Sequence, residues 1–150
     1  YTDIADNPVL DEKCNARRVS FDTLLTESDF ISIHVPLMES TRHLFNTDTF
    51  KKMKSSAYLI NTSRGPVIHE ADLVQALKNN ELAGAGLDVY ENEPAMAAGL
   101  ADQVNTVLTP HTASATEEAR TNMALKAARN LASMLEEDGT PPDCVNKEIL

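Results

Sequence analysis

Polar and charged side chains gather at the ends of four short apolar segments. These ends are His34-Val35-Pro36-Leu37, Asn61-Thr62-Ser63-Arg64-Gly65, Asp88 through Pro94, and Thr109-Pro110-His111-Thr112. They supply an arginine, two histidines and several acids. A guanidinium binds a carboxylate through two parallel hydrogen bonds, and an imidazole gives and takes a proton near neutral pH. The four ends therefore carry groups that can bind a small acid and move a proton, provided that the fold brings them together.

The apolar segments alternate with helical patterns along the chain. Strands are predicted over residues 30–35, 57–60, 83–89 and 104–108. Helices are predicted over residues 50–53, capped by Asn46 or Thr47, and over residues 71–77. The continuously apolar run 57–60 is typical of a strand buried on both faces of a sheet. This alternation predicts a parallel α/β sheet with right-handed crossovers, whose ligands bind at the carboxyl ends of the strands.

The last third of the chain has a different pattern. Ser114-Ala115-Thr116-Glu117 has the spacing of a capping box, and apolar residues recur after it at helical spacing. We expect one long helix over residues 116–136, with its apolar stripe packed in a core. Gly139 and the pair Pro141-Pro142 are expected to end it.

Composition excludes several classes of function. The chain has 150 residues, 42% of them hydrophobic, and a net charge of −10, which indicates a soluble globular protein. The acidic charge disfavours nucleic acid and anionic membranes as partners, and we find neither a membrane span nor a signal peptide. Cys14 and Cys144 lack metal-type spacing, so free thiols in a reduced cytoplasmic setting are expected.

The four polar segments, in this order and spacing, resemble the signature segments of the D-isomer-specific 2-hydroxyacid dehydrogenases. The resemblance extends from Tyr1 to Asn146, and the tail after His111 looks most like the glyoxylate/hydroxypyruvate reductase branch. It implies a Rossmann-type doubly wound parallel sheet. It also implies an enzyme that reduces a small 2-oxo acid to the D-2-hydroxy acid with NADH. It also implies a homodimer.

The resemblance assigns the catalytic roles to Arg64, Glu93 and His111. Arg64 matches the arginine that holds the substrate carboxylate and polarises its carbonyl. His111 matches the general acid/base, and Glu93 matches its paired carboxylate, which fixes the ring tautomer and stabilises the protonated ring. Glu91 has the same local chemistry, but the family places its catalytic acid directly before Pro94, so Glu93 is chosen.

The resemblance also assigns the cofactor contacts. Asp88 is expected to accept a hydrogen bond from the nicotinamide carboxamide, and His111 lies near the same ring. Asp3, at the expected end of a strand over residues 1–3, matches the acid that binds the adenosine ribose and repels a 2′-phosphate, which favours NAD over NADP. The remaining expected contacts follow two strands: His34, Val35, Pro36, Thr62, Ser63 and Arg64.

The glycine-rich turn that holds the pyrophosphate is not found among the five glycines of the chain. Gly84-Ala85-Gly86 lacks the third glycine and precedes an acidic loop, not a helix. We expect the turn to precede residue 1 in a longer enzyme. Residues 1–112 would then form part of the NAD-binding domain, and residues 113–150 would belong to the substrate domain. The 150 residues alone are expected to be poorly stable and inactive.

Two other interpretations of the same residues stay open. NAD-sensing corepressors share the family fold and keep its catalytic residues, so a binding protein is the first alternative. A truncated remnant without function is the second, supported by the absence of the glycine turn. His43 and His69 match no catalytic role; His69 stands where the family usually carries an Asp or Asn helix cap, and a histidine caps a helix less well.

Overall fold

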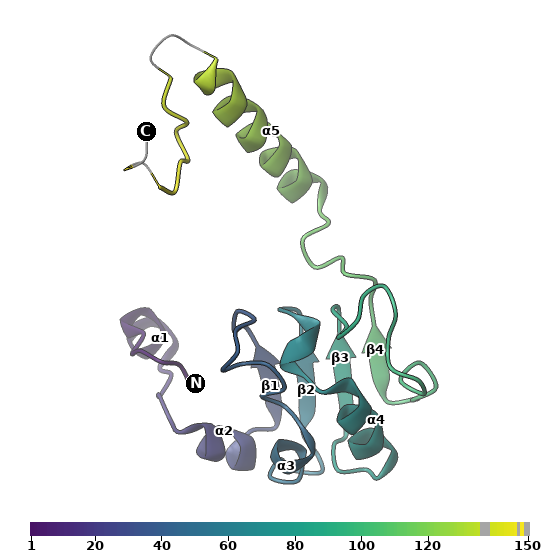
Figure 1. Ribbon diagram of the computed structural model, residues 1–150. Helices are drawn as coiled ribbons and strands as arrows, with labels where there is room; N and C mark the ends of the chain where they lie inside the picture. The colour runs from purple at the N-terminus through teal and green to yellow at the C-terminus, as the bar shows by residue number, and fades with distance from the viewer. Residues whose placement is uncertain (136–138, 147, 149–150) are drawn as a thin grey trace. The chain divides into compact units, whose positions relative to one another are not determined.

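The computed structural model describes residues 1–135, 139–146 and 148. The chain divides into two compact units, Tyr1–His111 and Thr112–Leu150 (Figure 1). In the described part of the chain, no helix combines the length and the hydropathy needed to cross a lipid bilayer. The expected helix end at Glu136 lies outside the described residues.

A four-stranded parallel sheet forms the centre of the first unit. Its strands lie in chain order: β1 (Phe30–Ile33), β2 (Tyr58–Asn61), β3 (Gly84–Leu87) and β4 (Thr106–Leu108). Each is parallel to its neighbour, with Asn61 in register with Ile33 on one side and Leu87 on the other. The predicted parallel α/β fold is confirmed, and all four predicted strands form; β1, β3 and β4 are shorter than expected, and β2 is shifted by one residue.

Helices cover one face of this sheet. In chain order the helical elements of the unit are α1 (Pro8–Cys14), α2 (Phe21–Glu27), α3 (Thr47–Phe50), the 3-10 turn η1 (Gly65–Val67) and α4 (Glu70–Lys78). Leu25 of α2, Phe50 of α3 and Leu73 of α4 are fully buried in the same core as the inward side chains Ile31 and Leu59. The helix expected over residues 71–77 forms within α4, and Asn46 caps α3 as expected, but α3 ends at Phe50, where the helix expected over residues 50–53 would have begun. α2 adds a third helix to the same layer.

The other face of the sheet is open, so the prediction that residues 57–60 are buried on both faces is wrong. Tyr58 is 44% exposed and stacks on Phe30, which is 70% exposed. Apolar residues recur over residues 57–60 for two reasons besides burial: they favour the strand conformation, and Tyr58 packs against a neighbour on the same face. Described helices pack only on the side where Leu59 points.

The expected strand over residues 1–3 does not form. Their backbone atoms contact the segment 17–19 instead: Val19 N–H donates to Tyr1 O, Tyr1 N donates to Arg17 O, and the Arg18 guanidinium donates to Asp3 O, each at 2.8 Å. A strand requires a neighbouring strand to satisfy its backbone groups, and none of the described strands pairs with this segment.

The backbone of Gly65 lies close to the backbone of Tyr90, so a side chain added at Gly65 is expected to destabilise the fold. A Cβ atom added there would overlap the backbone carbonyl of Tyr90, whereas one added at Gly86 would have its nearest neighbour 3.9 Å away. We expect Gly65→Ala to lower the free energy of unfolding by roughly 1–3 kcal/mol through overpacking. Gly86→Ala is the matched control and should leave it nearly unchanged. Urea unfolding measures both; equal midpoints for the two variants would contradict the close packing.

The second unit contains one long helix, α5 (Glu117–Met134), and a tail that folds back on it. Asp143 N–H donates to Asn130 Oδ1 at 3.0 Å, and Ser133 Oγ donates to Thr140 O at 3.0 Å. The predicted capping box starting at Ser114 is wrong: Thr116 is the N-cap and accepts the Ala119 N–H.

The apolar stripe of α5 does not pack in a core among the described residues. The helix contains no buried residue, and Met123 and Leu131 are 59% and 63% exposed. The expected core packing of this stripe is therefore not found. Helical periodicity shows which side chains share a face but says nothing about what covers that face.

Candidate active site

The carboxyl ends of the four strands carry the predicted site residues along one edge of the sheet. His34 follows β1, Thr62 follows β2, Asp88 follows β3, and Thr109 follows β4. Because neighbouring strands lie about 4.8 Å apart, the ends of β2 and β4 are roughly 10 Å apart across the sheet. One small ligand can therefore reach side chains from both.

Glu93 and His111 form a direct pair at the β3 and β4 end of this edge. Glu93 Oε2 lies 2.8 Å from His111 Nδ1, and Glu93 Oε1 accepts the Tyr90 N–H at 3.0 Å. The pairing holds the imidazole through Nδ1 and leaves Nε2 for another partner. His111 has a φ of 54°, a left-handed conformation that is uncommon for a residue with a side chain and is found more often at functional sites.

The hydrogen bond from His111 lowers the pKa of Glu93 below its ordinary value of 4.5, and the Tyr90 N–H adds to this effect. In the unfolded chain the pKa of Glu93 returns to its ordinary value, so the unfolded state binds more protons as the pH falls through this window. The pair thus contributes stability above about pH 4.5 and loses it as the pH falls through the lowered pKa. The effect is small because Glu93 is 36% exposed, which screens the pair.

We therefore expect Glu93→Gln to flatten the acid dependence of stability. Below about pH 4.5 the free energy of unfolding of the wild type should fall more steeply than that of the variant. Glu12→Gln, which alters an exposed carboxylate of α1, should follow the wild type. Urea unfolding over a pH series checks this, and identical acid profiles for the wild type and Glu93→Gln would disprove it.

A cavity of about 480 Å³ lies against this pair. Tyr90 lies beneath it with 7% of its surface exposed, and its hydroxyl donates to Thr109 O at 2.8 Å. Burial raises the pKa of Tyr90, as do the nearby carboxylates Asp88, Glu70 and Glu93, so its hydroxyl stays protonated. The cavity is lined by Tyr90, Glu93, Pro94, Met96, Leu108, Thr109, Pro110 and His111.

Arg64 lies on a second cavity, of about 600 Å³, at the β1 and β2 ends. The cavity is lined by His34, Val35, Pro36, Leu37, Thr62, Ser63 and Arg64. All the predicted cofactor contacts of these two strand ends thus face one space, and Leu37 joins them. Arg64 itself is exposed, and within the described residues its guanidinium donates only to the neighbouring Ser63 O, at 2.7 Å, which leaves its other donors available.

Asn61 positions this segment and was not singled out from the sequence. It is fully buried; its Oδ1 accepts from Ser63 N and Oγ, and its Nδ2 donates to Arg64 O at 3.0 Å. A polar amide at the end of an apolar strand is the signal that could have identified it, because a buried amide requires partners.

Asp88 and Asp3 occupy very different surroundings. Asp88 is 3% exposed and accepts a hydrogen bond from the Thr109 hydroxyl, so it links the ends of β3 and β4. Asp3 is exposed, and its carboxylate accepts the Ile4 N–H at 2.6 Å. Both carboxylates can accept hydrogen bonds from a ligand, but the structure places them in separate environments.

The two acids of the β3 loop are clearly distinguished by their partners. Glu91 does not pair with His111; its Oε1 lies 2.6 Å from His43 Nε2. The buried Glu70, also missed from the sequence, accepts the N–H groups of Glu91 and Ala97 and so holds this loop. The geometry thus pairs the acid chosen from the sequence, Glu93, with the histidine.

Comparison with known proteins decides the family. Residues 1–113 match the family described as D-isomer specific 2-hydroxyacid dehydrogenase, NAD binding domain. The chain belongs to this family. It is 53% identical over 137 residues to a glyoxylate reductase of Thermofilum pendens, covering 91% of this chain and 40% of that protein. It is 45% identical over 150 residues to glyoxylate/hydroxypyruvate reductase B of Klebsiella pneumoniae, covering 99% of this chain and 46% of that protein.

The structure of this chain matches solved members of the family. The NAD-complexed form of a D-isomer specific 2-hydroxyacid dehydrogenase from Lactobacillus delbrueckii ssp. bulgaricus superposes with a TM-score of 0.84 at 34% identity. The match covers 97% of this chain and 48% of that one. The chain thus spans less than half the length of these relatives.

The residues of the second cavity fit a dinucleotide. Its volume is in the range of ligand and cofactor sites, and it lies outside the carboxyl ends of parallel strands, where nucleotides bind in open α/β sheets. The exposed carboxylate of Asp3 makes no ion pair with the described residues and suits ribose hydroxyls.

Proposed function

We propose that this chain is part of an NAD-dependent dehydrogenase that reduces a small 2-oxo acid of the glyoxylate or hydroxypyruvate type to the D-2-hydroxy acid. The observation that carries the proposal is the Glu93–His111 pair on the same sheet edge as Arg64. A general acid and a carboxylate-binding cation are what reduction of a 2-oxo acid requires. The relatives named glyoxylate reductase and glyoxylate/hydroxypyruvate reductase support the choice of substrate.

Each of the three residues has a distinct role in this mechanism. Arg64 binds the substrate carboxylate through its fork of N–H donors and polarises the neighbouring carbonyl. His111 donates a proton from Nε2 to the carbonyl oxygen as that oxygen gains negative charge, and takes it back in the reverse reaction. Glu93 holds Nδ1 and stabilises the protonated ring. NADH, when bound, supplies the hydride.

The cofactor would be held by the residues at the β1 and β2 ends. His34, Val35 and Pro36 would line one side, with Thr62 and Ser63 on the other. Asp3 would bind the adenosine ribose and disfavour the 2′-phosphate of NADP, and Asp88 would face the carboxamide. We also propose that residues 1–112 belong to the NAD-binding domain and that residues 113–150 belong to the substrate domain. The full-length protein is proposed to be a cytoplasmic homodimer.

The direct test is an assay of the full-length protein that contains this chain. The absorbance of NADH is followed in three reactions, which contain glyoxylate, hydroxypyruvate or no 2-oxo acid. We expect oxidation that depends on the 2-oxo acid and is much weaker with NADPH. Tight NADH binding without turnover would instead indicate a corepressor-like binding protein and would contradict the proposal.

A further inference from the structure

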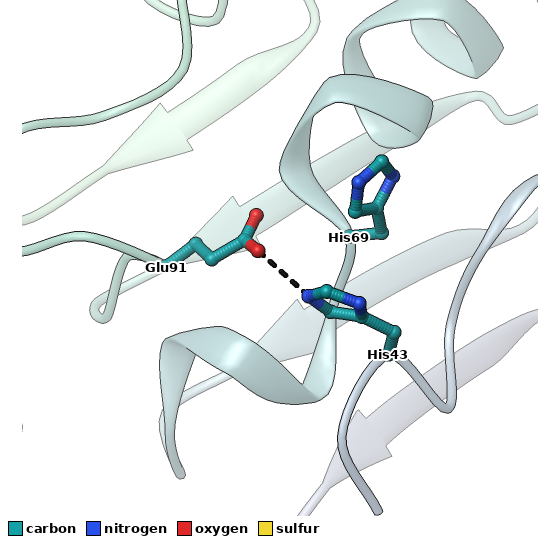
Figure 2. Close-up of side chains that lie close together, drawn as sticks. All are labelled: His43, His69 and Glu91. Atoms are coloured by element: carbon teal, nitrogen blue, oxygen red, sulfur yellow. Dashed lines mark hydrogen bonds and ion pairs between the residues drawn. The ribbon is translucent and has the colours of Figure 1, made fainter.

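A second cluster of chemical groups lies outside the residues that the proposed reaction uses. One ring nitrogen each of His43 and His69 and one carboxylate oxygen of Glu91 lie within 4.8 Å of one another. Figure 2 shows the three side chains converging from separate segments of the chain, with the His43–Glu91 contact dashed. We propose that His43, His69 and Glu91 bind a divalent transition metal of the Zn²⁺ class.

The donor set has the chemistry that such a metal prefers. Two imidazole nitrogens and a carboxylate oxygen suit Zn²⁺, which binds these atoms at about 2.0–2.2 Å with tetrahedral geometry. Ligand atoms in such a site are roughly 3.3 Å apart. The His43 Nε2–Glu91 Oε1 distance of 2.6 Å must widen and the longest separation must shorten, which requires side-chain shifts of roughly 1 Å.

The backbone holds the two histidines side by side. The His43 N–H donates to Pro66 O and the His69 N–H donates to Phe45 O, both at 2.8 Å, so the two segments are joined on each side of the cluster. The imidazole rings lie 4.7 Å apart between centroids, at 70°. A site whose ligands are held by the fold before metal arrives loses little freedom on binding.

Surrounding groups support the ligands, as in other metal sites. Glu91 Oε2 accepts the Glu70 N–H at 3.1 Å. Asp72 Oδ1 lies 2.9 Å from His69 Nδ1, and Asp72 Oδ2 accepts the Thr47 N–H. The Asp72 contact is at ion-pair distance, but His69 Nδ1 makes no hydrogen bond in this geometry. A small rotation of the ring would make it the carboxylate–imidazole pair that orients a ligating histidine.

The cluster is partly exposed to solvent, so a metal and a further ligand can reach it. The side chains of His43, His69 and Glu91 are 36%, 37% and 20% exposed. A metal can therefore enter from solvent, and a water molecule can complete the tetrahedron. On binding, the metal takes the place of the hydrogen between His43 Nε2 and Glu91 Oε1, and a neutral His43 ring then carries its hydrogen on Nδ1.

The metal would fix the loop that follows β3. Glu91 lies two residues before Glu93 in that loop, and a bond to the metal would tie the loop to His43 and to the N-terminus of α4 at His69. This positioning role for Glu93 rests on the proposed dehydrogenase function, whereas metal binding itself does not.

Calorimetric titration of the full-length, tag-free protein with Zn²⁺, after treatment with a chelator, tests the proposal. We expect one site with a Kd of about 1 µM or lower, weakened about 100-fold or more in His69→Asn and in Glu91→Gln. Asparagine is a good helix cap, so His69→Asn should keep its fold. Glu12→Gln is the matched carboxylate control and should bind Zn²⁺ like the wild type.

A second readout uses Co²⁺ and thermal unfolding, without NADH or substrate. Tetrahedral Co²⁺ should give a visible absorption band in the wild type and in Glu12→Gln but not in His69→Asn, and Zn²⁺ should raise the Tm of the first two only. Equal Zn²⁺ affinity in the wild type, His69→Asn and Glu91→Gln, or no binding by the wild type, would overturn the proposal. Neither readout depends on turnover, so a failure of the dehydrogenase assay is distinguishable from a failure here.

Discussion

The His111→Asn variant of the full-length protein is expected to reduce glyoxylate with a kcat about 10²- to 10⁴-fold below that of the wild type, the range lost when a general acid is removed. Asparagine tolerates the left-handed backbone that His111 adopts at φ 54°, so the loop should keep its shape. Its amide can neither donate an acidic proton nor take one back. The loss should therefore fall mainly on kcat, with a much smaller change in the Kd for NADH.

Two further measurements make this result specific. Added imidazole should restore part of the activity of His111→Asn, because it can occupy the place of the lost ring and carry the proton. Glu93→Gln should show a smaller loss than His111→Asn, since it removes the group that holds the ring and not the proton donor. Wild-type kcat in His111→Asn would exclude His111 as the acid.

Arg64→Gln has the second large expected effect, on kcat/KM for the 2-oxo acid. The guanidinium lies exposed on the second cavity, and its donors are available for a carboxylate. Losing a charged, two-bond contact costs about 3–4 kcal/mol, or roughly 10²- to 10³-fold in kcat/KM. Steady-state kinetics over a range of glyoxylate concentrations measures this loss. KM should rise markedly, because Arg64 binds the substrate carboxylate before the reaction as well as in the transition state.

Arg42→Gln is the matched control, because Arg42 is an exposed arginine outside both cavities. It should change kcat/KM by less than about twofold, which separates loss of the binding contact from loss of overall charge. Arg64→Lys keeps the charge but not the planar fork, and should stay closer to Arg64→Gln than to the wild type. Equal kcat/KM in Arg42→Gln and Arg64→Gln would contradict the proposed contact.

The sheet edge and its site residues were largely predictable because strand ends are marked by local sequence. An apolar run that stops at a polar residue locates the carboxyl end of a strand, and parallel order then places Arg64 and His111 on one edge. The choice of Glu93 over Glu91 did not come from local chemistry; it required the resemblance. The structure pairs Glu93 with His111 and gives Glu91 to His43.

What could not be predicted depends on contacts between distant segments. α1 and α2 have ordinary caps, Asn7 and Ser20, but neither cap is followed by a long periodic pattern, so the sequence does not indicate these two short helices. Glutamate is usually exposed on a helix, so the sequence predicts an exposed Glu70. It is buried because its carboxylate accepts two backbone N–H groups, from Glu91 and Ala97. Local patterns indicate neither such partners nor what covers a sheet face such as that of Tyr58.

The central claim is that Arg64, Glu93 and His111 act together in stereospecific reduction of a 2-oxo acid. The most direct test supplies the full-length protein with hydroxypyruvate and NADH carrying deuterium at the transferable position, and determines the configuration and label of the product. We predict D-glycerate with deuterium on C2, and almost none from His111→Asn. Glycerate of the L configuration, or no deuterium on C2, would contradict the account.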